Sequence, residues 1–270
     1  MKRFKPLNKK ILAAPLVQIT SKNFNSSTVA SVDNVGAAFL KTSLFHQLVT
    51  SVPVLQAVQA NVGVSLNGAG VSFWADQSGK GKHYSQSTVA SQPLYNPTGV
   101  NGRPTITFDG VDDFLTSSLQ LDLPGTKPTF LWLAFRQITW TNNDRIVGDG
   151  TNPNIMLLFQ STGSPGINIY NSFSPTVNIG ATIGSWVRVE ALFGNATTDY
   201  LKAGASTQTG TATGNSPPSG IQEIGRATSS SLCSNIEVIA VLYFSGLPTT
   251  AELAALSAAA VTYGGSGVLV

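Results

Sequence analysis

Short hydrophobic runs separated by turn residues dominate the chain from residue 53 onward. Gly, Pro, Asn and Asp flank these runs, and this combination is typical of β-strands joined by turns. The pattern predicts strands at 62–66, 71–74, 105–108, 129–135, 155–159, 166–170, 186–193, 223–224 and 236–244. Because no helices are interleaved with these strands, we expect an all-β sandwich or jelly roll.

A single helix is predicted near the carboxyl end. Thr249 can cap it, Glu252 three residues later completes a capping box, and Gly264 provides a stop. The helix then has an apolar face formed by Leu253, Leu256 and Ala260.

The amino-terminal 50 residues have a different composition from the rest. Five basic residues and no acid occupy the first ten positions, and they are Lys2, Arg3, Lys5, Lys9 and Lys10. The other 260 residues carry 11 basic and 13 acidic side chains, so the net charge of +3 comes from the amino end. We therefore expect a basic arm at 1–50 and a β-sandwich at 51–270. A solvated tail, a tether to a partner and a weak DNA contact are the alternatives for the arm, and we favour the tether.

The overall composition limits the class of protein. Hydrophobic residues make up 42% of the chain, but charged residues make up only 11%, against roughly 25% in ordinary soluble domains. An uncharged polar surface suits a chain that packs against neighbours, and it also suits an extracellular module. The apolar run at 11–17 is interrupted by Pro15, which disfavours a signal peptide, and no run approaches the roughly 18 residues of a membrane span.

Few residues are candidates for catalysis or metal binding. Cys233 is the only cysteine and is expected to be a small core residue, while His46 and His83 lack an acidic partner in the sequence. Asp109, Asp112 and Asp113 fit either a calcium site or a hydrogen-bonded turn, and Asp109-Gly110 favours the turn. We expect no cofactor.

Several segments are similar to the concanavalin A-like lectin/glucanase superfamily, specifically its laminin-G-like modules. They are WADQSG at 74–79, the Gln92-Pro93 step, FDGVDDFL at 108–115, GSWV at 184–187, IGR at 224–226, and IEVIAVLY at 236–243 with the helix that follows. The resemblance covers roughly 52–263 and implies a concanavalin A-like jelly-roll β-sandwich with a short carboxyl-terminal helix and an extended amino-terminal arm.

For function, the resemblance implies several classes, because this superfamily contains lectins, hydrolases, adhesive modules and virion proteins of tailed bacteriophages. A cysteine-poor, low-charge chain with a basic arm most resembles the phage group. We therefore expect a non-enzymatic virion structural protein of a bacteriophage, either a capsid decoration or a tail or fibre component. It would be located in the virion, with other virion proteins and copies of itself as partners, and with neither a membrane nor a nucleic acid as a partner.

The alternative is a lectin-like module that binds a host surface glycan. Trp140 lies at a polar strand end and is the residue expected to contact the sugar, while Trp132 and Trp186 lie in apolar strands and are expected in the core. A divergent glycan hydrolase is less favoured, because that mechanism needs two carboxylates. None of the four glutamates has a second acid two or four residues away.

Overall fold

The structure is a computed structural model that describes residues 53–117, 128–151, 157–160, 163–170, 175–193, 198–211, 221–227 and 231–265. All of these residues belong to one compact unit, Asp33–Val270. The basic residues expected to form a tether, Lys2, Arg3, Lys5, Lys9 and Lys10, lie outside the described residues.

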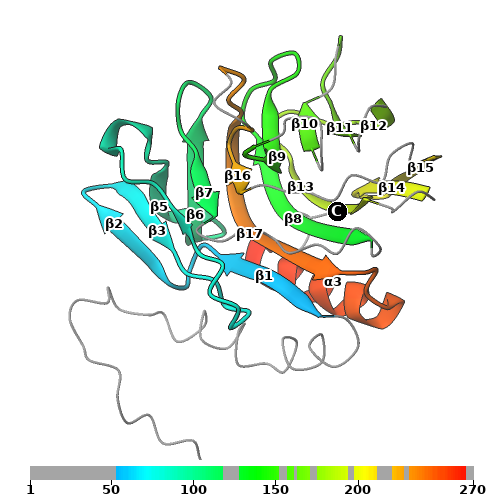
Figure 1. Cartoon of the computed structure of the whole chain (residues 1–270), viewed down its shortest axis with the longest axis horizontal. Coiled ribbons are helices and arrows are strands. Elements are labelled where there is room, and N and C mark those ends of the chain that lie inside the picture. The colour runs from blue at the N-terminus through cyan, green and yellow to red at the C-terminus, as the bar shows by residue number, and fades with distance from the viewer. Residues whose placement is uncertain are drawn as a thin grey trace, which may run out of the picture. The chain divides into compact units, whose positions relative to one another are not determined.

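The first group of paired strands, ladder one, is centred on the longest strand, β17 (Asn235–Ser245). Along one edge, β17 pairs with β6 (Arg103–Asp109) and then with β1 (Val54–Gln59). Along its other edge the order is β8 (Thr129–Gln137), β13 (Trp186–Phe193), β14 (Thr198–Ala203) and β15 (Ser206–Thr211). Figure 1 shows β8 and β17 as long curved strands that run side by side.

The second group, ladder two, contains the shorter strands. Its order is β2 (Val64–Asn67), β3 (Gly70–Trp74), β4 (Tyr84–Ser85), β7 (Leu115–Ser117), β16 (Gln222–Ile224), β9 (Arg145–Asp149), β10 (Leu157–Gln160), β11 (Gly166–Tyr170) and β12 (Pro175–Gly180). The strand β5 (Leu94–Val100) pairs with both β6 and β3 and so joins the two ladders. All of these pairings are antiparallel, which confirms the all-β expectation for the described residues.

The main core lies between the ladders. Leu131, Leu133 and Phe135 of β8 pack in one cluster with residues of ladder two such as Trp74 and Ile224. The alternate residues Phe130, Trp132 and Ala134 belong to a second cluster on the opposite, outer face of ladder one. Because successive side chains of a strand point to opposite faces, burial on both sides requires the continuous apolar run of β8.

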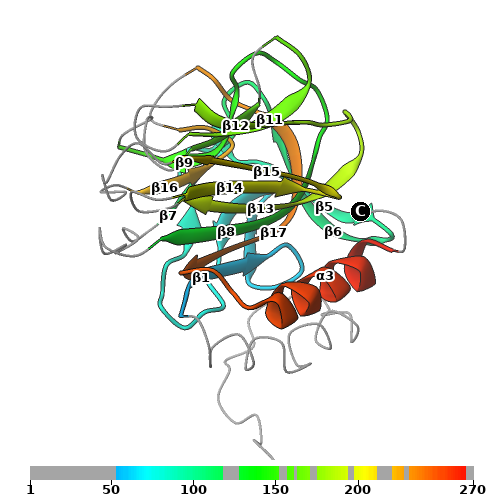
Figure 2. The same cartoon turned by 90° about the vertical axis from the view of Figure 1, so that its right-hand side faces the viewer.

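The helix α3 (Thr250–Gly264) supplies the cover for that second cluster. Thr249 is its N-cap, and the predicted capping box with Glu252 is present. Leu256, Ala260 and Tyr263 pack against the outer face of β1, β8 and β17. Figure 2 looks onto this face and shows α3 on the β1 side, with no described element over β13 and β14. The helix therefore covers only part of the outer face of ladder one.

Candidate functional site

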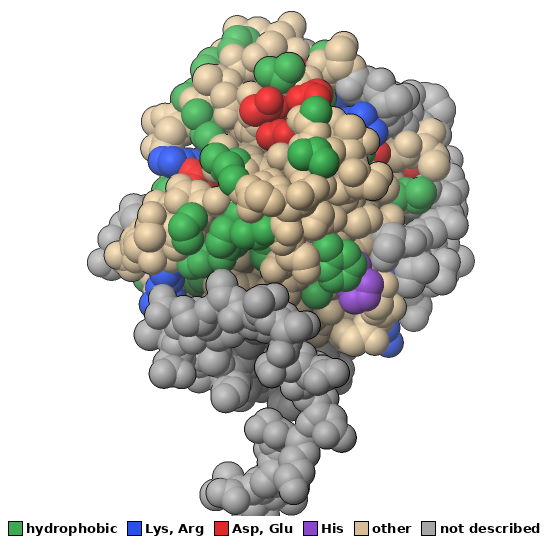
Figure 3. Space-filling view, turned by 90° about the vertical axis from the view of Figure 1, so that its left-hand side faces the viewer, with side chains coloured by type: hydrophobic (Ala, Val, Ile, Leu, Met, Phe, Trp, Pro, Cys, Tyr) green, Lys and Arg blue, Asp and Glu red, His purple; other side chains and the backbone are tan. Residues whose placement is uncertain are grey.

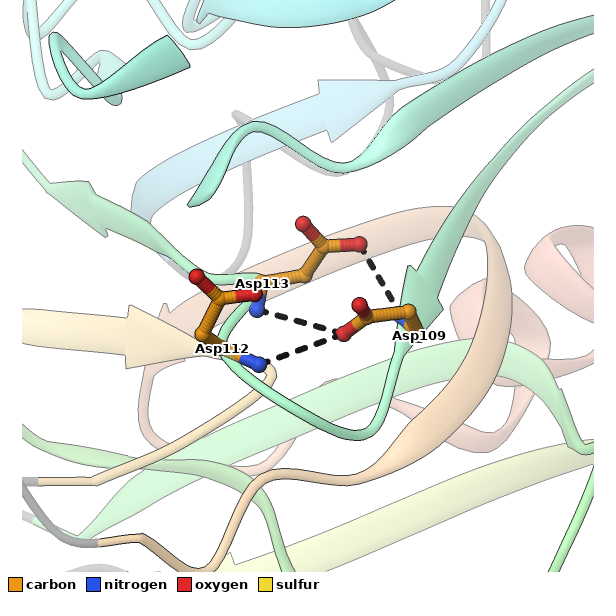
Figure 4. Close-up of side chains that lie close together, drawn as sticks. All are labelled: Asp109, Asp112 and Asp113. Atoms are coloured by element: carbon orange, nitrogen blue, oxygen red, sulfur yellow. Dashed lines mark hydrogen bonds between the residues drawn. The ribbon is translucent and has the colours of Figure 1, made fainter. Parts of the chain in front are cut away.

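The three aspartates of the β6–β7 connection form a hydrogen-bonded turn (Figure 4). Asp109 Oδ1 accepts hydrogen bonds from the backbone N–H groups of Val111, Asp112 and Asp113 at 2.8, 3.3 and 3.4 Å. Asp113 Oδ2 accepts from the Asp109 N–H at 3.0 Å, and Gly110 has a φ of +77°. These bonds confirm the turn prediction. Burial, opposed by the Asp109 hydrogen bond and reinforced by the charges of Asp109 and Asp112, raises the pKa of Asp113 to about 6.

A second acidic turn holds the β3–β4 connection against β1. Asp76 Oδ1 accepts from the backbone N–H groups of Ala57 and Ser78, both at 2.9 Å, and its Oδ2 accepts from the Lys82 N–H at 3.0 Å. The Asp76 N–H donates to His83 Nδ1 at 3.0 Å. His83 is therefore a hydrogen-bonded turn residue, while His46 lies outside the described residues.

The side of the molecule formed by β2, β3 and β5 shows mostly apolar and uncharged polar side chains among a few charges (Figure 3). Leu66 of β2 and Leu94 of β5 are exposed there, at 46% and 51%. Scattered exposed apolar residues are common on protein surfaces and do not by themselves define a site.

The outer face of ladder one carries a more organised set of charges around Glu190 of β13. Glu190 is 1% exposed. Its Oε1 lies 3.4 Å from Lys202 Nζ and 3.8 Å from Arg188 Nε, and its Oε2 accepts from the Tyr200 hydroxyl at 2.9 Å. The pKa of Tyr200 is raised, first by burial and then by the negative charge of Glu190. The tyrosine therefore stays a neutral donor to this carboxylate.

A second buried glutamate lies on the same face, in β17. Glu237 is 1% exposed. Its Oε2 accepts a hydrogen bond from Arg136 Nε at 2.7 Å and lies 2.5 Å from Arg136 Nη2. Its Oε1 accepts from the hydroxyl of Thr105. The Arg136 guanidinium lies over the Trp186 ring, 5.2 Å from its centroid, which is a cation–π geometry.

Strand register explains how these groups share one face. Along β8, Trp132 is opposite Glu190 on one side, and Arg136 is opposite both Trp186 and Glu237. Positions 132 and 136 of one strand point to the same side of the sheet. We call this set the outer-face cluster, and its residues are Arg136, Trp186, Arg188, Glu190, Tyr200, Lys202 and Glu237.

The tryptophans do not all lie where the sequence placed them. Trp132 is a core residue at 2% exposure, as predicted. Trp186 was also expected in the core, but it is only partly buried, because the end of β13 that it occupies has no described element over it and Arg136 is its neighbour. Trp140 is half-buried in the β8–β9 loop, outside the strands that carry the outer-face cluster.

The structure also places the single cysteine. Cys233 is 3% exposed, and burial raises the pKa of its thiol to about 11, so the prediction of an inert core residue is confirmed. Among the described residues no helix is long and apolar enough to cross a membrane.

Comparison with known proteins gives matches only at the level of structure, since no family model and no curated protein matches the chain. A Trypanosoma rangeli sialidase in complex with sialic acid matches with a TM-score of 0.57 and 10% identity, over 87% of this chain. A GH54 α-L-arabinofuranosidase soaked with a cyclic sulfate inhibitor and an arabinofuranosidase complexed with arabinofuranosyl-α-1,2-xylobiose each match with a TM-score of 0.59 over 82% of this chain, at 12% and 13% identity.

The chain spans 38% of the length of the sialidase and 65% and 64% of the two arabinofuranosidases. At these identities the likeness shows the fold alone. The expectation of a bacteriophage virion structural protein is nevertheless wrong, because the fold is shared with enzymes that act on glycans and these comparisons point to no virion protein. Low charge and a basic amino end, which led to that expectation, are compatible with many functions.

Proposed function

We propose that this chain is a glycan-binding module without catalytic activity, built on a concanavalin A-like jelly-roll sandwich. The two facing ladders, the shared core and the carboxyl-terminal helix support this fold assignment. The structural likeness to a sialidase and to arabinofuranosidases supports the link to glycans. Glycan binding was the second of the functions expected from the sequence.

The observation that carries the proposal is the outer-face cluster beside the uncovered part of ladder one. Small-molecule sites combine an apolar or aromatic surface with a few well-placed polar groups. Trp186 supplies a partly exposed ring, and Arg136 and Lys202 supply donors fixed in position by buried glutamates. The backbone of these residues is held in regular strands, so the donors lie on a rigid surface rather than on a loop.

Glu190 and Glu237 are poorly suited to catalysis, because they lie far apart and both are engaged in ion pairs and hydrogen bonds. Glycosidases of the two-carboxylate type place the carboxyl groups about 5–10 Å apart. Glu190 and Glu237 lie on the two strands that flank β8, opposite positions four residues apart. From the strand rise and spacing, their Cα atoms are separated by roughly 17 Å. All four carboxylate oxygens are also engaged by neighbouring side chains.

The test is a glycan array with the full chain, followed by calorimetric titration of the best ligand. We expect Trp186→Ala to abolish binding while Trp140→Ala leaves it unchanged, with the midpoint of thermal unfolding measured for both variants as a control on folding. If Trp140→Ala alone abolishes binding, the site is in the β8–β9 loop. If no glycan binds to the unmodified protein, the proposed function is wrong.

A further inference from the structure

The outer-face cluster presents its basic and acidic groups unequally to solvent. The side chains of Glu190 and Glu237 are each 2% exposed, whereas those of Arg136 and Lys202 are 35% and 31% exposed. The acids therefore lie beneath the bases. Three basic side chains face two carboxylates in the cluster, so its formal charge is +1.

Burial beneath the bases explains why the carboxylates cannot serve a neutral sugar. The side chains of Glu190 and Glu237 are 2% exposed, and each of their oxygens already has a neighbouring donor or positive charge. Neutral sugars present hydroxyl groups, which need acceptors as well as donors. A ligand that approaches this face meets mainly donors and positive charge.

Arg136 has the geometry that suits a planar anion. A guanidinium carries five N–H donors; Arg136 directs one from Nε and one from Nη2 at Glu237, which leaves the two of Nη1 and the second of Nη2 for another anion. Its guanidinium carbon lies 5.2 Å from the centroid of the Trp186 ring, so the fork is held between Glu237 and the indole. Arginine held in this way forms paired hydrogen bonds to a carboxylate, while lysine acts as a point charge beside it.

We infer that the glycan bound at this face is acidic and carries a carboxylate, as in an oligosaccharide of uronic acids. This inference rests on the proposed function and narrows its ligand class. The carboxylate lies against Arg136 and Lys202, and the ring of an adjoining sugar lies against Trp186. Since the attraction is between charges at a partly exposed surface, the affinity falls as salt concentration rises.

The experiment compares an oligogalacturonate of three sugars with its methyl ester, by calorimetric titration of the full chain. The ester keeps the size, ring and hydroxyl groups but removes the negative charge. We expect binding of the acid, at least about tenfold weaker binding of the ester, and a loss of about tenfold in Lys202→Gln. Lys80→Gln, which removes an exposed lysine from the β3–β4 turn, is the matched control and should bind as the unmodified protein does.

A second variant, Arg136→Lys, separates a loss of ligand binding from a loss of folding. Arg136→Lys keeps a positive charge beside the buried Glu237 but loses the planar fork, and we expect it to weaken binding of the acid without changing the weak binding of the ester. Equal affinity for acid and ester would overturn the acidic-ligand inference while the glycan-binding function stands. Equal binding of dextran sulfate would overturn it as non-specific ion attraction. Binding of neither these ligands nor any glycan on the array would overturn the function itself.

Discussion

Replacing Tyr243 by Phe should stabilise the protein, although it removes a polar group from the core. Tyr243 of β17 and Tyr84 of β4 are both 0% exposed, and neither hydroxyl makes a hydrogen bond of regular geometry. Burial is the largest cause that raises the pKa of each, and a hydrogen-bond-like contact between the two hydroxyls also shifts both pKa values. The two hydroxyls are thus neighbours, but their contact lies outside regular hydrogen-bond geometry, so we expect it to offset little of the cost of burying them.

The magnitude follows from the cost of an unpaired buried hydroxyl, about 1–3 kcal/mol. Tyr243→Phe keeps the ring that packs in the main core and removes this cost, so the free energy of unfolding should rise by about 1 kcal/mol. For a domain of this size, that change corresponds to an increase of about 2–4 °C in the midpoint of thermal unfolding.

Tyr263→Phe provides a matched control, because Tyr263 of α3 is also 0% exposed but its hydroxyl donates to the carbonyl of Pro104 at 2.6 Å. The same substitution there removes a hydrogen bond and leaves a carbonyl group without that donor, so it should cost about 1 kcal/mol. Urea unfolding followed by tryptophan fluorescence would measure both changes, provided that the slope of the transition is unchanged.

The two substitutions are chemically identical and should have opposite signs, which makes the result decisive. A destabilisation by Tyr243→Phe as large as that of Tyr263→Phe would refute the reasoning. It would mean that the Tyr243 hydroxyl has a partner, such as Tyr84 or an ordered water molecule bridging the two rings.

Three further predictions concern charge, reactivity and the helix. Because the pKa of Asp113 is raised to about 6 in the folded protein, its contribution to stability is fully present below about pH 4 and is lost as pH rises through 6. Asp113→Asn should therefore reduce the loss of stability between pH 5 and 7. It should not abolish that loss, because the pKa of Asp144 is also raised to about 6. Cys233 should react with a thiol reagent at pH 8 far more slowly in the folded protein than in urea, and equal rates would show that it is accessible. Glu252→Ala removes the acceptor for the Thr249 N–H and should cost about 1 kcal/mol in urea unfolding, whereas an unchanged midpoint would show that the cap contributes nothing.

The sequence predicts best those elements whose apolar pattern is sustained. β8, β13 and β17 were predicted within two residues at each end, because packing between the ladders and under α3 requires long apolar runs. The helix was predicted from its cap, since Thr249 and Glu252 form a local motif that needs no tertiary contact.

Some of the strands that the sequence missed carry little burial signal, although β1 and β9 were also missed and are mostly buried. The hairpin β14–β15 contains Ser206–Thr211, which reads STQTGT and has no apolar residue. β5 contains Pro97 and Gly99, residues that ordinarily indicate a turn, and its pairing with β6 is interrupted between Asn96 and Val100. Pairing with a neighbouring strand, rather than local preference, holds these segments in place.

The outer-face cluster could have been found only in part. Trp186, Arg188 and Glu190 alternate along β13, and this spacing places one aromatic and two charged groups on a single face. Spacing of acids along one strand cannot relate Glu190 to Glu237, because the two lie on different strands, 47 positions apart. Their common face depends on β8 lying between them with a particular register, and register is a tertiary property.

The low charge content of the chain has a different meaning once this register is known. By itself, so low a charge content favours a surface that packs against neighbours. Two of the four glutamates are in fact buried on one face, where they position Arg136 and Lys202 toward solvent. An ion pair buried only for stability gains little, because the cost of removing both charges from water offsets their attraction. Partly exposed bases held by buried acids, beside a partly exposed aromatic ring, are better explained by a ligand that needs those bases in fixed positions.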